Sequence, residues 1–165
     1  MEKLNIAILA SGQGSTLKAI CDAVKHNVLN LNIACILTNV SDNSESNESN
    51  ESNINKIGID YGIKVHNHQS NTDISRTQYN RTIALCLNEY DLDVVVCAGW
   101  NYILNKEFID SFNLVINLHP ALPNTFVGQN CIQKAFDAFK RGEIKYTGSM
   151  VHQVIEDVDK GQVLN

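Results

Sequence analysis

The stretch Leu4-Asn5-Ile6-Ala7-Ile8-Leu9-Ala10-Ser11-Gly12-Gln13-Gly14-Ser15-Thr16 decides how this chain folds. Its first seven residues form an apolar run that is too short for a helix and rich in branched side chains, which indicates a buried strand. Two glycines follow, and from Ser15 onward apolar residues recur at helical spacing. A strand, a glycine turn and a helix in this order form the first unit of a parallel sheet.

The rest of the chain repeats this alternation of strands and helices. Apolar runs predict strands over residues 31–39, 63–65, 93–99, 112–119 and 146–154, and helical spacing predicts helices over residues 54–61, 76–90, 106–111 and 131–141. The pattern predicts an α/β fold, a doubly wound, mostly parallel sheet with helices on both faces. Residues 41–53 consist almost wholly of Ser, Asn, Glu and Asp, so we expect a low-complexity flexible loop there.

Length and charge narrow the possible functions. With 165 residues, the chain is expected to form a single domain over residues 1–165. A formal net charge of -5 leaves no basic footprint for nucleic acid or for anionic lipid. No apolar run is long enough to span a bilayer and no signal-like segment opens the chain, so we expect a cytoplasmic protein without a membrane partner. The five cysteines are odd in number and far apart, which indicates reduced, mostly buried thiols.

The candidate chemistry lies at Asn117 and His119, two residues apart and directly before Pro120. In an extended strand such positions point to one face, so the two polar side chains would converge. Pro120 cannot continue a central strand, which places the pair at the carboxyl end, where open α/β sheets bind ligands. The carboxamide can donate to an oxyanion and the imidazole can carry a proton, with Asp159 as the candidate carboxylate partner. In the alternative interpretation, Asn117 closes a turn and His119 caps the strand.

The glycine turn predicts a phosphate site. Gly12 and Gly14 let the backbone approach an anion closely, and the following helix offers unpaired N–H groups. A dinucleotide fingerprint would need a third glycine where Leu17 stands and an acidic residue at the end of the second strand, which instead ends in Thr38 and Asn39. The pattern therefore favours a phosphate monoester over a dinucleotide.

Other candidate ligands and nucleophiles carry less weight. His66 and His68 stand at strand spacing, but no third ligand accompanies them in the sequence, so we interpret them as surface histidines. His152 faces inward by alternation and is typical of a core or site-adjacent imidazole rather than a catalyst. Cys131 has no base beside it in sequence, and we interpret it as a packing residue.

Four motifs in this order carry a resemblance to a known family. They are Ser11-Gly12-Gln13-Gly14-Ser15, Cys97-Ala98-Gly99-Trp100, Asn117-Leu118-His119-Pro120-Ala121-Leu122-Pro123 and Val154-Ile155-Glu156-Asp157-Val158-Asp159-Lys160-Gly161. With them the chain resembles the phosphoribosylglycinamide formyltransferases, folate-dependent enzymes of purine biosynthesis, and most closely their fungal branch. The resemblance covers nearly the whole chain outside the Ser/Asn/Glu segment.

The resemblance implies a set of site residues. The catalytic residues would be Asn117, His119 and Asp159. The substrate phosphate would be held by Gly12, Gly14, Ser15 and Thr16. The folate would be bound by Arg76, Asn101, Tyr102, Ile103, Leu104, Asn117, Ile155, Glu156, Asp157, Val158 and Asp159. Two positions depart from the family pattern: Thr16 replaces the usual Asn, and Tyr102 stands where most bacterial members carry Arg.

The resemblance also implies the reaction. A formyl group would pass from the co-substrate 10-formyltetrahydrofolate to the amine of 5'-phosphoribosylglycinamide, a small-molecule substrate, without a metal. Asn117 would hold the tetrahedral oxyanion, His119 would assist proton transfer, and Asp159 would raise the pKa of His119. The protein would act as a monomer or a homodimer.

Two alternatives stay open beside this reaction. One is another folate-dependent formyl-group enzyme on the same fold, such as a formyltetrahydrofolate hydrolase or a methionyl-tRNA formyltransferase. The acidic pI and the lack of an added RNA-binding domain count against the tRNA enzyme, and the lack of an extra N-terminal regulatory domain counts against the hydrolase. The other is a truncated, non-catalytic folate or phosphate binder, because the chain stops where family members continue with a strand and a C-terminal helix. We therefore expect the domain to lack that strand and helix.

Overall fold

A computed structural model describes residues 3–40, 53–69 and 73–165 of the chain. The predicted flexible loop at residues 41–53 lies outside these residues, apart from Asn53, which begins a helix. Among the described residues, no helix is long and apolar enough to cross a membrane.

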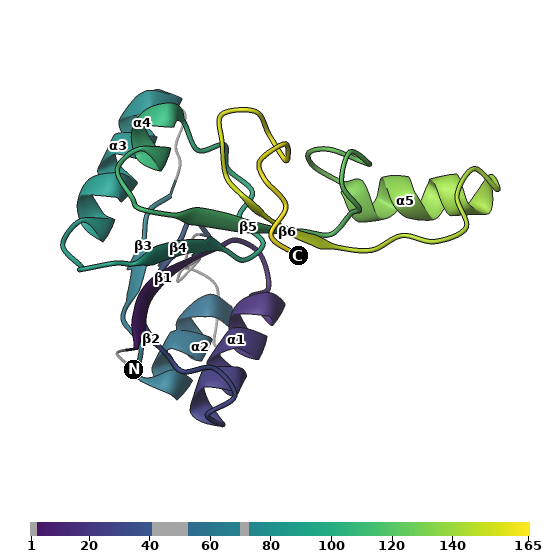
Figure 1. Cartoon of the computed structure of the whole chain (residues 1–165). Coiled ribbons are helices and arrows are strands. Elements are labelled where there is room, and N and C mark those ends of the chain that lie inside the picture. The colour runs from purple at the N-terminus through teal and green to yellow at the C-terminus, as the bar shows by residue number, and fades with distance from the viewer. Residues whose placement is uncertain (1–2, 41–52, 70–72) are drawn as a thin grey trace, which may run out of the picture.

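A six-stranded sheet organises the fold (Figure 1). In chain order, its strands are β1 (Leu4–Ala10), β2 (Leu31–Thr38), β3 (Val65–Asn67), β4 (Val94–Cys97), β5 (Val115–His119) and β6 (Met150–Gln153). Their spatial order is β3-β2-β1-β4-β5-β6, and every neighbouring pair is parallel except β5 and β6. The predicted doubly wound, mostly parallel α/β sheet is confirmed.

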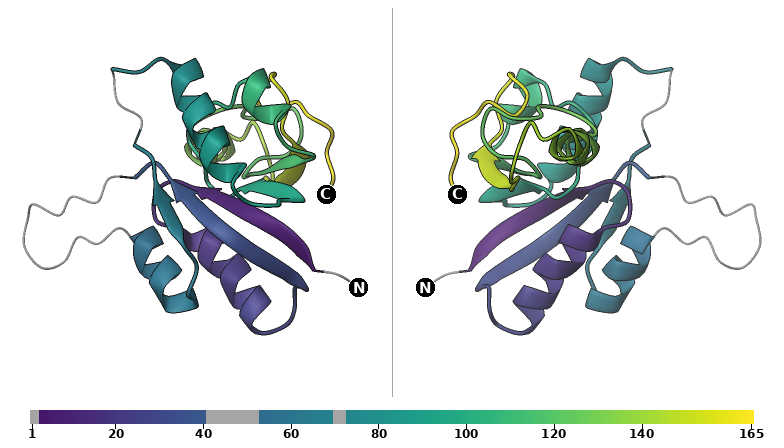
Figure 2. Two further views of the ribbon diagram at one scale, coloured as in Figure 1. Left: turned by 90° about the vertical axis from the view of Figure 1, so that its left-hand side faces the viewer. Right: turned by 90° about the vertical axis from the view of Figure 1, so that its right-hand side faces the viewer.

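Helices cover both faces of the sheet (Figure 2). The helices are α1 (Ser15–Lys25), α2 (Asn53–Tyr61), α3 (Arg76–Leu87), α4 (Lys106–Ile109) and α5 (Cys131–Lys140), and the first four cover the sheet. Alternation along β1 divides the core: Ile6 and Ile8 pack on the face covered by α1 and α2, while Ala7 and Leu9 pack on the face of α3 and α4. Both faces of the central strands are therefore buried from solvent, as their continuous apolar runs predict.

Several element boundaries differ from those predicted. Strand β3 begins at Val65 rather than at residue 63, because Ile63 takes part in the C-terminal cap of α2. The Ile63 N–H donates to the Gly58 carbonyl, and Gly62 adopts φ +66°. Strand β6 begins at Met150 rather than at residue 146. Its partner β5 ends at His119, directly before Pro120, and Met150 pairs with His119, so the chain before Met150 has no strand to join.

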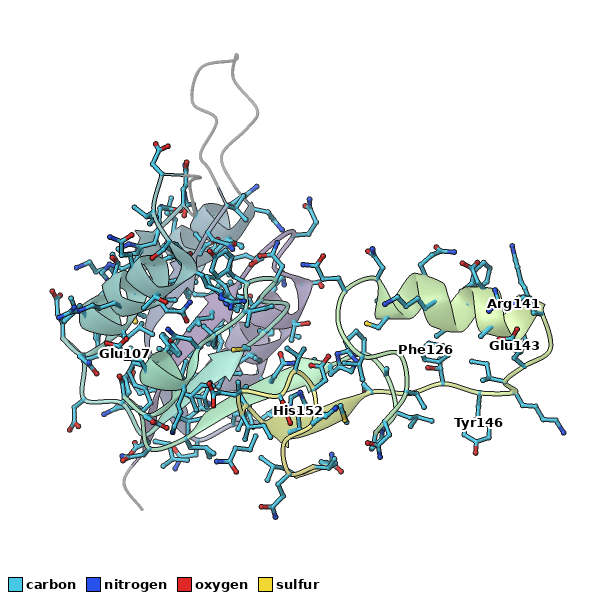
Figure 3. The ribbon with its side chains drawn as sticks, turned by 90° about the horizontal axis from the view of Figure 1, so that it is seen from above. Glu107, Phe126, Arg141, Glu143, Tyr146 and His152 are labelled. Atoms are coloured by element: carbon cyan, nitrogen blue, oxygen red, sulfur yellow. The ribbon has the colours of Figure 1, made fainter. Side chains whose placement is uncertain are left out.

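Residues 120–149, which we call the arm, extend beyond the sheet between β5 and β6. They hold α5 and the chain that returns to β6, and Figure 1 shows α5 set apart from the other helices. Seen from above, labelled arm residues such as Arg141 and Tyr146 lie far from the sheet, whereas His152 lies within it (Figure 3). The arm therefore meets the sheet at the carboxyl end of β5.

Candidate functional site

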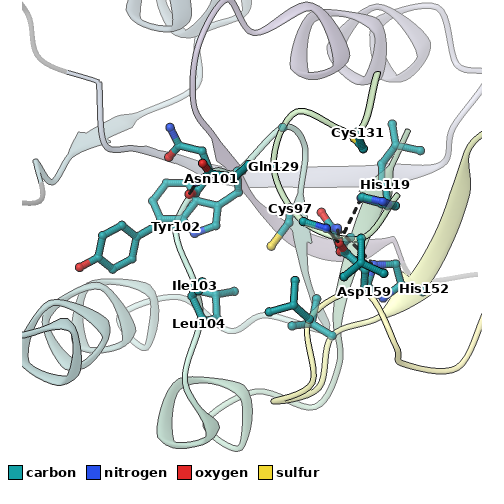
Figure 4. Close-up of a pocket in the computed structure, with 18 of the residues that line it drawn as sticks. Cys97, Asn101, Tyr102, Ile103, Leu104, His119, Gln129, Cys131, His152 and Asp159 are labelled. Carbon is teal, nitrogen blue, oxygen red and sulfur yellow. Dashed lines mark hydrogen bonds and ion pairs between the residues drawn. The ribbon is translucent and has the colours of Figure 1, made fainter. Parts of the chain in front are cut away.

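The carboxyl ends of β4 and β5, together with β6, create a polar centre in an otherwise apolar sheet. Asn117 and His119 belong to β5 and leave it on the same face, as predicted. Because β6 runs antiparallel to β5, His152 pairs directly with Asn117. The segment that follows β6 then returns Asp159 to the same place (Figure 4).

Asp159 lies between two imidazoles. Its Oδ2 is 3.4 Å from Nδ1 of His119, and its Oδ1 is 3.4 Å from Nε2 of His152. The side chains are 7%, 5% and 2% exposed for Asp159, His119 and His152, so these contacts are almost shielded from solvent. Asn117 completes the group: its Nδ2 is 3.2 Å from the same ring nitrogen of His152 and 3.5 Å from Oδ1 of Asp159. A carboxylate, a carboxamide and two imidazoles thus share one buried centre.

The beginning of the arm holds this centre from the other side. The backbone N–H of Gly128 donates to Oδ2 of Asp159 at 2.8 Å, and Nε2 of His119 is 3.3 Å from the carbonyl oxygen of Phe126. Phe126 and Asp159 adopt φ values of +46° and +56°, which residues other than glycine rarely do. Such backbone strain persists only where the surroundings over-determine it, and it concentrates at functional sites.

A cavity of about 760 Å³ opens beside the four polar side chains. Its wall is formed mainly by the tip of β4, the end of β5, the beginning of the arm and the segment after β6. Trp100 belongs to this wall, and its indole Nε1 is buried without a hydrogen-bond partner among the described residues. A buried donor of this kind is costly unless something accepts from it, which marks the cavity as a ligand site.

Hydrogen bonds between strand ends fix the loop that follows β4. The Ser11 hydroxyl donates to Oδ1 of Asn39 at 2.7 Å and accepts from the backbone N–H of Asn101 at 3.2 Å. Nδ2 of Asn39 in turn donates to Oδ1 of Asn101 at 2.8 Å. The ends of β1, β2 and β4 are therefore tied together, and one wall of the cavity has a fixed shape.

Most of the predicted folate residues lie on the cavity wall. Those that line it are Asn101, Tyr102, Ile103, Leu104, Asn117, Ile155, Glu156, Val158 and Asp159, together with His119. Asp157 does not line it. Arg76 begins α3 as an exposed residue and does not line it either; its carbonyl accepts from Asn80, whose side chain also reaches the carbonyl of Ile103. The structure thus gathers the three predicted catalytic residues and leaves Arg76 and Asp157 outside the wall.

The predicted phosphate residues form the turn before α1, outside the cavity wall. Gly14 is the N-cap residue with φ +69°, and no side chain caps the helix. A Cβ at Gly14 would lie 3.0 Å from Ile57 and 3.2 Å from Ile54, so the side chains of α2 leave little room for one. Ser15 and Thr16 form the first turn of α1, on the same carboxyl edge of the sheet as the cavity.

Two partners of Asp159 were not among the predicted site residues. His152 was interpreted as a core or site-adjacent imidazole, and the alternation that places it inward was its only signal in the sequence. Gly128 carried no signal, because its donor is a backbone N–H. Both depend on the antiparallel pairing of β5 with β6 and on the path of the arm.

His66 and His68, interpreted from the sequence as surface histidines without a third ligand, have a third candidate ligand beside them in the structure. Both are half-buried, and Cys86 of α3 lies with them. The prediction of reduced, mostly buried cysteines is confirmed: all five are free, and Cys21, Cys35, Cys97 and Cys131 are buried. Burial raises the pKa of Cys97 to about 12, which makes this thiol on the cavity wall a poor nucleophile.

The centre can stabilise negative charge and move a proton. Asn117 offers two amide hydrogens, and the longer of its two contacts, 3.5 Å to Oδ1 of Asp159, is the weaker one that a stronger acceptor in the cavity could replace. The ring nitrogens of His119 lie 3.4 Å from Oδ2 of Asp159 and 3.3 Å from the carbonyl oxygen of Phe126. An oxyanion forming in the cavity would lie beside a carboxamide and an imidazole, two groups that can donate hydrogen bonds.

Comparison with known proteins identifies close relatives. The family model described as formyl transferase matches residues 4–165. A phosphoribosylglycinamide formyltransferase of Dictyostelium discoideum is 34% identical over 97% of this chain and 80% of its own length. One of Schizosaccharomyces pombe is 36% identical over 96% of this chain and 78% of its own length. A solved phosphoribosylglycinamide formyltransferase of Bacillus halodurans superposes with a TM-score of 0.84 at 25% identity, over 98% of this chain and 77% of that chain.

Proposed function

Because this chain belongs to the formyl transferase family, we propose that it transfers a formyl group from 10-formyltetrahydrofolate to the amine of 5'-phosphoribosylglycinamide, a step of purine biosynthesis. Relatives at 34% and 36% identity bear the name of this activity. In this chain, the observation that carries the proposal is the buried centre of Asn117, His119 and Asp159 beside the cavity.

The cavity suits the pterin end of a folate. Its volume of about 760 Å³ lies within the range of about 300–1,000 Å³ that is typical of small-molecule sites. Leu104 and Val154 supply apolar wall, and the indole N–H of Trp100 can donate to a ring acceptor. The loop of residues 155–159 bounds the cavity and carries Asp159, so the same segment shapes the folate site and completes the polar centre.

The turn before α1 suits the phosphate of the second substrate. A helix that begins at Gly14 without a side-chain cap leaves the N–H groups of its first turn for an anion, and the hydroxyls of Ser15 and Thr16 add donors. The chain carries a net charge of -5, so a local site of this kind has to supply the attraction for an anionic substrate.

The chemistry follows from the groups of the centre. The substrate amine attacks the formyl carbon, and the carbonyl oxygen becomes an oxyanion that accepts from Asn117 and from protonated His119. Collapse of this intermediate breaks the bond from the formyl carbon to the folate nitrogen, and the proton lost by the amine passes by way of His119 to that nitrogen. Asp159 balances the charge of the imidazolium and fixes its orientation.

Formyl transfer to 5'-phosphoribosylglycinamide tests the proposal, with the folate product followed by absorbance. His119→Ala is expected to lower kcat about 100- to 10,000-fold through loss of the acid–base group. Asn117→Ala is expected to lower kcat about 100- to 1,000-fold through loss of an oxyanion donor. His26→Ala is the matched control, because this histidine lies at the exposed C-terminal end of α1 and should leave turnover unchanged.

The outcome that contradicts the proposal is specific. Far-UV circular dichroism first establishes that each variant is folded. A folded His119→Ala variant with wild-type kcat would show that the buried centre around His119 does not take part in the reaction. Release of formate at the same rate with and without the acceptor amine would show hydrolysis instead of transfer.

A further inference from the structure

A second polar cluster lies at the opposite edge of the sheet from the cavity. His66 belongs to β3, the edge strand, and His68 follows it, while Cys86 comes from the last turn of α3. One ligand atom from each of the three residues lies within 4.8 Å of the other two. Two imidazole nitrogens from the β3 segment and one sulfur from α3 therefore lie close together.

The backbone around the two histidines is fixed before any ligand binds. His66 pairs with Leu37 of β2 in the parallel ladder. At His68, the N–H donates to the carbonyl of Thr38 at 2.8 Å, and the carbonyl accepts from the Tyr79 hydroxyl at 2.7 Å. Only the side chains remain to be adjusted when the three groups close on an ion.

The rings themselves are also oriented. The Tyr90 hydroxyl lies 2.7 Å from Nε2 of His66, with the two rings edge to face at 5.7 Å between centroids. The rings of His66 and His68 are stacked at 6.4 Å. Histidines that bind metals ordinarily have their second ring nitrogen held by such a hydrogen bond, which fixes the ring for ligation.

From this arrangement we propose that His66, His68 and Cys86 bind a zinc ion that fastens edge strand β3 to helix α3. Imidazole and thiolate are ligands that Zn²⁺ prefers, and with three protein ligands the site would be of the open type, in which water takes the fourth position. Bond lengths of about 2.0–2.3 Å place tetrahedral ligand atoms about 3.5 Å apart. The three side chains thus need to close by about 1 Å, which rotation about their side-chain bonds provides.

The charges around the cluster set how zinc binding varies with pH. Burial lowers the pKa of His66 and His68, and Lys64 lowers that of His66 further, so both rings are neutral and free to ligate at pH 7. Burial and Glu89 raise the pKa of the Cys86 thiol, which Lys64 opposes; Tyr90 and Cys35 are the other titratable groups nearby. Zinc must displace the thiol proton, so affinity is expected to fall as the pH is lowered.

Cobalt(II) titration of the purified chain tests the site, because Co²⁺ bound by a thiolate shows a charge-transfer band in the near ultraviolet. We expect one Co²⁺ per chain with this band, and its loss when Zn²⁺ displaces the cobalt. Cys86→Ser should abolish the band and weaken Zn²⁺ binding more than about 100-fold, beyond the roughly 10- to 100-fold effect of an outer partner. Tyr90→Phe, which removes such an outer partner, should weaken it about tenfold.

Controls separate this cluster from the other thiols and from misfolding. Cys131→Ser removes a thiol at the arm and should leave the band and the affinity unchanged. His68→Gln tests the same site without touching the α3 core, and Zn²⁺ should raise the midpoint of thermal unfolding in the wild type but not in this variant. Absence of the band in the wild type, or equal affinity in the wild type, Cys86→Ser and His68→Gln, would overturn the proposal.

Discussion

Helices α1 and α5 are similar in sequence character but differ in their surroundings. Both are strongly amphipathic, begin at a residue in the left-handed conformation without a side-chain cap, and carry lysine in the last turn. Leu17 and Cys21 of α1 are buried against the sheet, whereas Phe136 and Phe139 of α5 are 50% and 56% exposed. An amphipathic pattern therefore predicts a helix and its apolar side, but not whether another element covers that side.

Truncation of one apolar side chain in each helix should give the largest contrast. Leu17 is fully buried among β1, β2 and α2 residues, so Leu17→Ala is expected to lower the free energy of unfolding by about 2–5 kcal/mol. Phe136→Ala removes a half-exposed ring and should cost under about 1 kcal/mol. Urea denaturation followed by circular dichroism measures both. A loss at Phe136 as large as that at Leu17 would mean that the apolar side of α5 is covered in solution.

The contrast between α1 and α5 also explains how far the sequence could predict the fold. Strand β1 and helix α1 depend on local periodicity and a glycine turn; the bounds of β1 and the start of α1 at Ser15 were predicted as observed. The start of β6 was not predicted correctly, because it depends on where its partner strand β5 ends. Local signals determine elements, while pairing over long separations determines their limits.

In the candidate site, too, some contacts follow from a local pattern and others depend on long-range pairing. Asn117 and His119 are two residues apart in one strand, so their convergence follows from the strand period alone. The placing of Asp159 beside them was expected from the resemblance, and the structure brings the three together. The contacts with His152 and Gly128, and the approach of Cys86 to His66 and His68, join elements whose relative positions no local pattern encodes.

Glycine substitutions extend the comparison from the helices to the loops that follow β6 and α5. A Cβ at Gly161 would lie 1.7 Å from the carbonyl oxygen of Gln153, a backbone atom of β6 that cannot move freely. Gly161→Ala is expected to cost about 1–3 kcal/mol in the free energy of unfolding and to displace the nearby Asp159. A displacement of about 1 Å lowers turnover by up to about 100-fold.

Gly142, just after α5, is the matched control for Gly161. A Cβ there meets nothing within 4 Å, although φ is +73°. Gly142→Ala should therefore cost only about 1–2 kcal/mol from the left-handed backbone, with turnover unchanged. Both quantities come from urea denaturation and the formyl-transfer assay. Equal losses of turnover in the two variants would show that the contact with Gln153 does not position Asp159.

Substitutions at the N-cap residues of α1 and α5 should give a smaller difference in the free energy of unfolding. Gly14 has φ +69° and faces Ile57 of α2, so Gly14→Ala is expected to cost about 1–2 kcal/mol, mainly from the backbone. Asn130 caps α5 at φ +60° and makes no capping bond, so Asn130→Gly should change the free energy of unfolding by less than about 0.5 kcal/mol. Thermal and urea unfolding give both values. A large loss for Asn130→Gly would show that its side chain holds the arm.

Exposed ion pairs should show no difference between the two helices. Lys18 pairs with Asp22 within α1 at 2.7 Å, and Arg141 pairs with Glu143 after α5 at 2.6 Å. All four side chains are more than one-third exposed, so solvent and salt screen both pairs whether or not their helix packs on the sheet. Lys18→Gln and Glu143→Gln should therefore leave the midpoint of urea unfolding unchanged at physiological salt. A lower midpoint for Glu143→Gln alone would mean that the end of α5, whose Phe136 and Phe139 rings are half-exposed, depends on surface charge for its stability, whereas α1 does not.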